Sequence, residues 1–180
     1  MRMRTRILQL FLALAVSTSA GVSAQTSAPH PDIHYVPTPG AVVDSMLEAA
    51  HVTANDVVYD LGSGDGRIVI EAAKKYGARG VGIELDPKLI KQATRNARKA
   101  GVADKVRFQQ ADFFKTDLSE ATVVTLYLSG TINQRLESKL MRELGPGARV
   151  VSHRFEMPPD WKPDRDLSIR GTHVYVWTIR

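Results

Sequence analysis

Three glycines at alternate positions interrupt the segment "VYDLGSGDGRIVIEAA" (residues 58–73), between a hydrophobic run and the beginning of an amphipathic pattern. Gly62, Gly64 and Gly66 allow this turn to adopt positive φ angles, and they carry no Cβ atom. A ligand can therefore lie against bare backbone at the N-terminus of the helix that follows. The spacing predicts a small-molecule site at this turn.

The charge of the loop indicates which ligand it suits. Asp60 precedes the glycines and Asp65 stands between the second and the third. Because carboxylates attract cations and repel anions, they favour a positively charged ligand over a pyrophosphate. The GxGxG spacing also differs from the GxGxxG dinucleotide fingerprint, so a nicotinamide-dependent oxidoreductase is a poor interpretation.

Two later segments add groups that suit an adenosine without phosphates. Glu84 in "GIELDP" follows the glycines at close to the roughly 20-residue spacing at which an acidic side chain accepts both ribose hydroxyls. In "QQADFF", Asp112 can accept from an exocyclic amine and Phe113 can lie against a purine face. Each residue alone has a structural alternative of equal weight, as a turn, a helix cap or a core side chain. Their joint position after successive strands favours the binding site.

The rest of the chain alternates hydrophobic runs with amphipathic ones, which predicts an α/β fold. Continuous apolar strands separated by helices indicate a doubly wound, mostly parallel sheet, and the C-terminal pattern predicts a hairpin with an antiparallel last strand. Thr38 and Pro39 predict the cap and first turn of a helix before the first strand. The predicted strands are 56–61, 80–85, 105–111, 121–128, 148–153, 166–170 and 172–180, and the later helices are 66–76, 86–100 and 132–144.

The first 24 residues have the layout of a secretory signal peptide. Arginines precede the apolar run from Ile7 to Val16, and "VSA" ends at Ala24 as a cleavage site. We therefore expect export to the periplasm or the exterior after cleavage, with a membrane anchor formed by residues 7–24 as the alternative. Residues 25–37 are expected to form an extended linker, and residues 38–180 the folded domain.

Composition excludes several classes of protein. The chain has no cysteine, which excludes disulfides, thiolate metal sites and a cysteine nucleophile. Three of the 24 basic residues lie in the first 24 residues, which contain no acid, so the remaining 21 face 19 acidic residues. Such a near-neutral balance gives no argument for nucleic acid.

The motifs "VYDLGSGDGR", "GVGIELDP" and "QQADFF" resemble those of class I, seven-stranded S-adenosylmethionine-dependent methyltransferases. With "YVPTPGAVVDSML", "TVVTLYL" and "ELGPGARVVSHRF", the chain resembles the small lysine methyltransferases related to the mitochondrial enzymes that act on the adenine nucleotide translocase and the ATP synthase c-subunit. The resemblance implies S-adenosylmethionine as cofactor, a Rossmann-like seven-stranded sheet, and a protein substrate with an acceptor lysine, including a membrane-associated one.

The same resemblance implies roles for single residues. Asp60 and the glycine loop would hold the methionine moiety, Glu84 the ribose, and Asp112 with Phe113 the adenine. Tyr35 and Thr38, before the first strand, would cover the cofactor. The cofactor-binding residues expected in this way are Tyr35, Thr38, Asp60, Gly62, Ser63, Gly64, Asp65, Gly66, Glu84, Asp112 and Phe113.

The residues that would bind the methyl acceptor are harder to identify from the sequence. "SGTINQ" (residues 129–134) stands where the family has a proline-containing or acidic stretch. Tyr127 and His153, at the ends of two predicted strands, are weak candidates for a catalytic base, and packing at the strand ends is the favoured interpretation. His30 and His34 have a metal-like spacing, but they lie in the linker, so no metal site is expected. Methylation of a small molecule or lipid, and a non-catalytic adenosine-ligand binding protein, are the alternatives.

Overall fold

The computed structural model describes residues 35–180, so the predictions for the signal segment, most of the linker, His30 and His34 lie outside the described residues. Seven strands and four helices follow one another along this part of the chain. They are α1 (Gly40–Ala49), β1 (Val57–Leu61), α2 (Arg67–Tyr76), β2 (Arg79–Glu84), α3 (Pro87–Lys99), β3 (Val106–Gln110), β4 (Val123–Leu126), α4 (Gly130–Glu143), β5 (Arg149–His153), β6 (Arg165–Ile169) and β7 (Thr172–Thr178).

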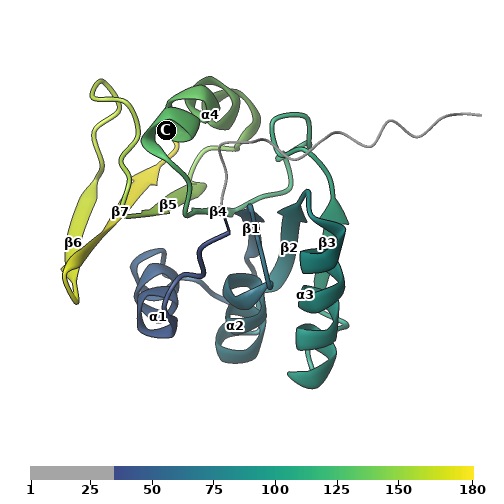
Figure 1. Cartoon of the computed structure of the whole chain (residues 1–180). Helices are drawn as coiled ribbons and strands as arrows, with labels where there is room; N and C mark the ends of the chain where they lie inside the picture. The colour runs from purple at the N-terminus through teal and green to yellow at the C-terminus, as the bar shows by residue number, and fades with distance from the viewer. Residues whose placement is uncertain (1–34) are drawn as a thin grey trace, which may run out of the picture.

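The strands form one sheet in the order β3-β2-β1-β4-β5-β7-β6 (Figure 1). Strands β1 to β5 pair with one another in parallel, whereas β7 is antiparallel to both β5 and β6. Alternate residues of β1 point to opposite faces: Val58 packs with α1 and α2, while Val57 and Tyr59 pack with α4. Helices thus cover both faces, and the predicted doubly wound α/β fold is confirmed.

The helix ends follow from local chemistry. Gly66 and Gly77, both with left-handed backbone, bound α2. Asp86 caps α3 by accepting from the Lys88 N–H at 2.7 Å. Most boundaries differ from the prediction by one or two residues, and two of these differences bear on the site. Pro39, not Thr38, is the cap residue of α1, and no side chain caps that end.

The second difference lies after β4. This strand ends at Leu126, so Tyr127 lies beyond it, and α4 begins at Gly130 because the Ser129 side chain accepts from the Ile132 N–H. The stretch 129–134 is therefore the cap and first turn of α4, which begins two residues earlier than the sequence pattern indicated.

A buried carboxylate fixes the edge of the sheet at which the parallel strands begin. Asp56 accepts from the Thr53 N–H at 2.7 Å, from the Thr122 hydroxyl at 2.6 Å and from the Arg149 guanidinium at 2.7 Å. Burial would raise the pKa of Asp56, but the bonds from Thr122 and Arg149 outweigh burial, and the pKa is lowered. The contacts hold the starts of β1, β4 and β5 together.

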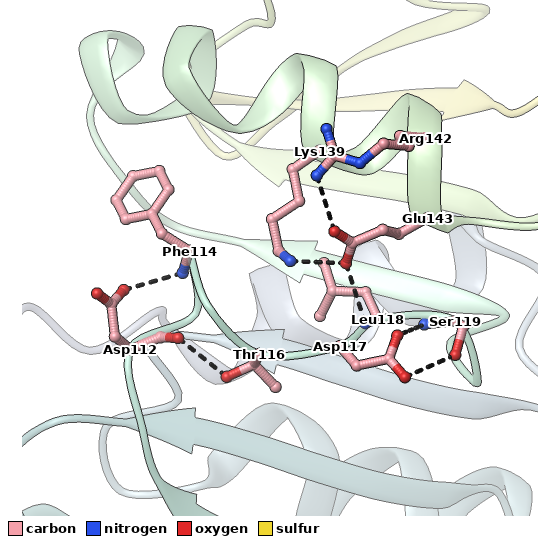
Figure 2. A network of polar contacts seen from close by, with 9 residues as sticks. All are labelled: Asp112, Phe114, Thr116, Asp117, Leu118, Ser119, Lys139, Arg142 and Glu143. Carbon is pink, nitrogen blue, oxygen red and sulfur yellow. Dashed lines mark hydrogen bonds and ion pairs between the residues drawn. The ribbon is translucent and has the colours of Figure 1, made fainter.

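Figure 2 shows how the connection between β3 and β4 is tied to α4. Glu143 of α4 accepts from the Leu118 N–H at 3.3 Å and from the buried Lys139 ammonium at 2.6 Å. Arg142 donates to the other oxygen of the same carboxylate. This network fixes the loop whose first residues are Asp112 and Phe113.

Candidate functional site

The glycine loop connects β1 to α2 at the edge where the parallel strands end. Gly62, Gly64 and Gly66 all have positive φ, and the N–H groups of Gly62 and Ser63 bind the Ile83 carbonyl at the end of β2. A Cβ atom on Gly64 would lie 2.2 Å from the Tyr35 ring, which therefore lies directly on the loop. At Gly64 it is thus the Tyr35 ring that lies against the bare backbone, and contact of a ligand with this loop stays a prediction.

The third glycine, Gly66, is required for packing within the fold. A Cβ atom on Gly66 would lie 2.6 Å from the Phe108 ring and 3.0 Å from the Ala93 side chain. Gly66 therefore leaves room for packing between β3 and α3. In the same way, Gly82 leaves room for the Ser63 side chain, whose buried hydroxyl has no hydrogen-bond partner within residues 35–180.

Arg67 fastens the entry segment onto this loop. Its guanidinium donates to the Thr38 carbonyl at 2.9 Å and to both carboxylate oxygens of Asp65, at 2.9 and 2.7 Å. The Asn96 side chain donates to the Asp65 carbonyl from α3. Neither Arg67 nor Asn96 was identified from the sequence. The one signal in the sequence for Arg67 is that it directly follows the last glycine of the loop.

The two loop carboxylates differ in charge compensation. Burial would raise the pKa of Asp65, but the Arg67 guanidinium outweighs burial and the pKa is lowered, so this charge is already neutralised by a partner. Asp60 has no basic partner among the described residues. It is 3% exposed and accepts from the Thr125 hydroxyl at 2.8 Å.

Burial therefore raises the pKa of Asp60 to about 7; the Thr125 bond opposes this shift, and the nearby charges of Glu84 and Asp65 add to it. A cation placed against Asp60 would remove this penalty by stabilising the ionised form. Of the two aspartates expected to attract a cation, Asp60 is thus the one that is free to do so.

Glu84 reaches across from the end of β2 to the glycine loop. One carboxylate oxygen accepts from the Gly64 N–H at 3.0 Å, and the other accepts from the N–H groups of Leu85 at 2.7 Å and Asp86 at 3.0 Å. A carboxylate offers about four lone-pair sites. The oxygen that faces Gly64 thus has capacity for a hydroxyl donor beside the loop.

Asp112 and Phe113 follow β3 at the same edge. One Asp112 oxygen accepts from the Phe114 N–H at 2.9 Å, and its side chain is only 14% exposed (Figure 2). Phe113 is 4% exposed and packs in the core on the α4 face, with its ring centroid 4.8 Å from that of Phe114. The Phe113 ring is therefore largely committed to the core, and its contact with a purine remains a prediction.

The two candidates for a catalytic base, Tyr127 and His153, lie near the glycine loop. The Leu128 side chain would come within 3.2 Å of a Cβ atom on Gly62, so the segment after β4 touches the glycine loop. The Tyr127 ring centroid lies 4.0 Å from that of His153. His153 is 3% exposed, and burial followed by the charge of Arg154 lowers its pKa, which favours the neutral imidazole. Packing at the strand ends thus accounts for His153.

Residues 35–180 contain neither a metal-binding cluster nor a membrane-spanning helix. No cluster of three or more acidic or histidine side chains is gathered there that could hold a metal ion. In the same residues, no helix is long and apolar enough to cross a membrane.

The residues at this edge fit S-adenosylmethionine. This cofactor carries positive charge, which would compensate the unpaired carboxylate of Asp60. It also carries ribose hydroxyls, which could donate to the free lone pairs of Glu84 beside the glycine loop. The sequence profile of the ANTKMT methyltransferase domain matches residues 60–165, which include all these groups.

Individual proteins agree with this profile. A protein-lysine N-methyltransferase of Saccharolobus islandicus is 44% identical, over 83% of this chain and 95% of its own length. An adenine nucleotide translocase lysine N-methyltransferase of Mus musculus is 39% identical over 82% of this chain, which spans 63% of that relative. A crystal structure described as an RNA methyltransferase from Salinibacter ruber, in complex with S-adenosylhomocysteine, is 60% identical with a TM-score of 0.79, over 80% of this chain and 94% of its own. The chain therefore belongs to the ANTKMT methyltransferase domain family and is an S-adenosylmethionine-dependent methyltransferase.

Proposed function

We propose that this methyltransferase acts on a lysine side chain of a protein. The observation that carries the proposal is the 44% identity to a protein-lysine N-methyltransferase along 95% of that relative's length. When bound, the cofactor would supply an electrophilic methyl group for in-line displacement: the nucleophile would bond to the methyl carbon as the carbon–sulfur bond breaks, and S-adenosylhomocysteine would leave.

The chain's own residues would bind and orient the reactants. We assign Asp60 to the ammonium of the methionine moiety, because it is the buried carboxylate without a basic partner. The backbone from Gly62 to Gly66, with Ser63 and Asp65, would follow the same moiety, and Glu84 would accept from the ribose. Asp112 and Phe113 would border the adenine. The Tyr35 ring on Gly64, fixed through Thr38 and Arg67, would cover the site.

The acceptor amine must lose a proton before it can attack, because the unperturbed pKa of lysine is about 10.4. Burial of an ammonium against apolar side chains lowers its pKa, and alignment of the amine supplies much of the rate acceleration. We propose that the segment after β4 provides the surface against which the acceptor amine is buried. Tyr127 is the better placed of the two base candidates, since His153 is buried.

One observation favours a second candidate acceptor. The Salinibacter ruber structure is described as an RNA methyltransferase, and its sequence is 60% identical. Transfer of a labelled methyl group to cell extracts tests both, with separate extracts treated with protease or with ribonuclease. Loss of label with protease alone is expected. Loss with ribonuclease alone would replace lysine by RNA, label resistant to both would indicate a small molecule or lipid, and no label despite cofactor binding would indicate a non-catalytic binding protein.

We propose further that the acceptor is presented at an anionic membrane surface. Within the described residues, the exposed face of α3 carries five cationic side chains without an ion-pair partner, and α3 contains no acid; they are Lys88, Lys91, Arg95, Arg98 and Lys99. Such a face attracts acidic lipid headgroups. In a flotation assay at low salt, the protein should rise together with vesicles that contain phosphatidylglycerol. Equal flotation with neutral vesicles would contradict this proposal.

Export stays part of the proposal, because of the basic and apolar pattern of the first 24 residues. Mass spectrometry of the mature N-terminus is the test. A chain that begins at Gln25 supports cleavage, and an intact N-terminus in the membrane fraction would support the anchor.

A further inference from the structure

Asn133 is a fully buried amide in the first turns of α4. Its nitrogen donates to the Ser152 hydroxyl at 3.2 Å and to the carbonyls of Phe155 at 3.0 Å and Glu156 at 3.2 Å. Because carbonyls only accept, the nitrogen of the amide must face them, which fixes its orientation. Asn133 thus ties α4 to the segment that follows β5.

The tied segment contains an unusual turn. Arg154 has φ 71°, and the Phe155 N–H donates to the His153 carbonyl at 2.9 Å, which closes a three-residue turn. A turn of this kind with positive φ is rare and strained in residues other than glycine. The Ser152 hydroxyl also donates to the Phe155 carbonyl, at 2.5 Å. The hydrogen bonds from Asn133 and Ser152 therefore hold a backbone conformation that the local sequence does not favour.

The turn determines where the Phe155 ring lies. This ring stacks with Tyr127, at 6.5 Å between centroids and 27° between planes, and the other neighbour of Tyr127 is His153 at 4.0 Å. Tyr127 and Phe155 are both half-buried, so each keeps part of its ring accessible. Leu128, next to Tyr127, contacts the glycine loop. The two rings therefore stand at the cofactor edge of the sheet.

We infer that Asn133 is a positioning residue that holds Phe155 beside Tyr127, and that these two rings form the surface on which the cationic side chain of the acceptor lies. The inference rests on the proposed lysine acceptor. Aromatic faces attract ammonium and guanidinium groups. The Phe155 ring already accepts one cation, since the Arg154 guanidinium lies 5.6 Å from its centroid.

The test uses the whole chain saturated with S-adenosylhomocysteine, with n-butylammonium as a mimic of the lysine side chain and 1-butanol as its neutral counterpart. We expect butylammonium to shift the NMR signals of the Tyr127 and Phe155 rings, and butanol to leave them nearly unchanged. Asn133→Ala should weaken the butylammonium response at least threefold and keep S-adenosylhomocysteine affinity within twofold. Gln134→Ala, the exposed neighbour on α4, is the matched control and should behave as the parent chain.

Phe155→Leu removes the ring but leaves the Asn133 hydrogen bonds to the backbone, and it should lose the response even if Asn133→Ala fails to fold. Equal shifts with butanol, or an unchanged response in Phe155→Leu, would overturn the inference. Failure of the chain to bind S-adenosylhomocysteine would instead contradict the cofactor assignment. In labelling of the protease-sensitive fraction, Asn133→Ala should raise KM for the acceptor more than it lowers kcat. A purely structural defect would lower thermal stability and cofactor affinity together.

Discussion

The Glu84 carboxylate at the end of β2 accepts a hydrogen bond from the Gly64 N–H at 3.0 Å, across the gap between two strand ends. This bond places the acid that is proposed to hold the ribose against the loop that is proposed to hold the methionine moiety. The two halves of the cofactor site are therefore coupled before any ligand enters.

Replacing Glu84 by alanine should weaken S-adenosylhomocysteine binding by roughly 10–100-fold, because hydrogen bonds to a charged group contribute about 1.5–3 kcal/mol. Calorimetry measures the change. The 2′-deoxy form of the ligand is the control: it should bind more weakly than the parent ligand to the unaltered chain, and the difference should shrink in Glu84→Ala. An unchanged difference would refute the ribose assignment and leave only a role of Glu84 in loop structure.

Cofactor affinity should rise with pH in the range just below neutrality. The pKa of Asp60 is raised to about 7, so below that pH the proposed partner of the ammonium is protonated in the free protein. Between pH 5.5 and 7 we expect affinity to increase by up to about tenfold per pH unit. Asp60→Asn should bind weakly, with a flat pH profile over this range.

The same carboxyl should affect stability in the opposite direction. Its pKa is higher in the folded state than in the unfolded state, so the folded state binds more protons between about pH 4 and 7. The free energy of unfolding of the free protein should therefore fall as pH rises through this window, and be steadier in Asp60→Asn. A profile that is identical in both proteins would contradict the raised pKa.

Alanine at Gly66 should destabilise the fold by about 2–4 kcal/mol, because a strained backbone and overpacking each cost about 1–3 kcal/mol. Urea unfolding measures the loss. Gly171→Ala is the matched control, since Gly171 shares the φ of 80° but has open space around its Cβ position. It should cost only about 1–2 kcal/mol. Equal losses would mean that Phe108 and Ala93 adjust freely.

Asp56→Ala should lower the free energy of unfolding by about 3 kcal/mol, because it leaves the guanidinium of Arg149 without its partner in a mostly buried place. The exposed pair of Asp44 and Lys75, at 3.0 Å, is the control, and Asp44→Ala should change stability by less than about 0.5 kcal/mol. The pKa of Asp56 is lower in the folded state, so its contribution is complete above the unfolded pKa and is lost as pH falls through the folded pKa. The parent chain should thus lose more stability than Asp56→Ala on acidification.

Sequence patterns predicted the sheet and its helices because strands buried on both faces are continuously apolar and because Asp86, Gly77 and Gly66 mark helix ends. They placed the beginning of α4 two residues late, since the cap at Ser129 depends on a single side-chain bond. The glycine loop and Glu84 could be proposed for the cofactor because their spacing is nearly constant in such folds.

The acceptor side was not predictable to the same degree. Asn133 acts on residues 19 to 23 positions away, and only the meeting of β5 with α4 brings them within reach. Arg67 likewise acts on a carbonyl 29 residues earlier. Contacts of this kind leave no periodic pattern, so the sequence supported predictions for the cofactor side of the site and few for the acceptor side.

The bond from Arg67 to the Thr38 carbonyl also determines where the chain enters the domain. Because Tyr35 lies on Gly64, the described part of the chain begins at the edge that carries the glycine loop. Any tether attached through that end, whether a lipid-facing segment or a fused protein, would hold the reactive edge toward its own attachment point. The position of a single tyrosine thus sets the direction in which this methyltransferase would face its surroundings.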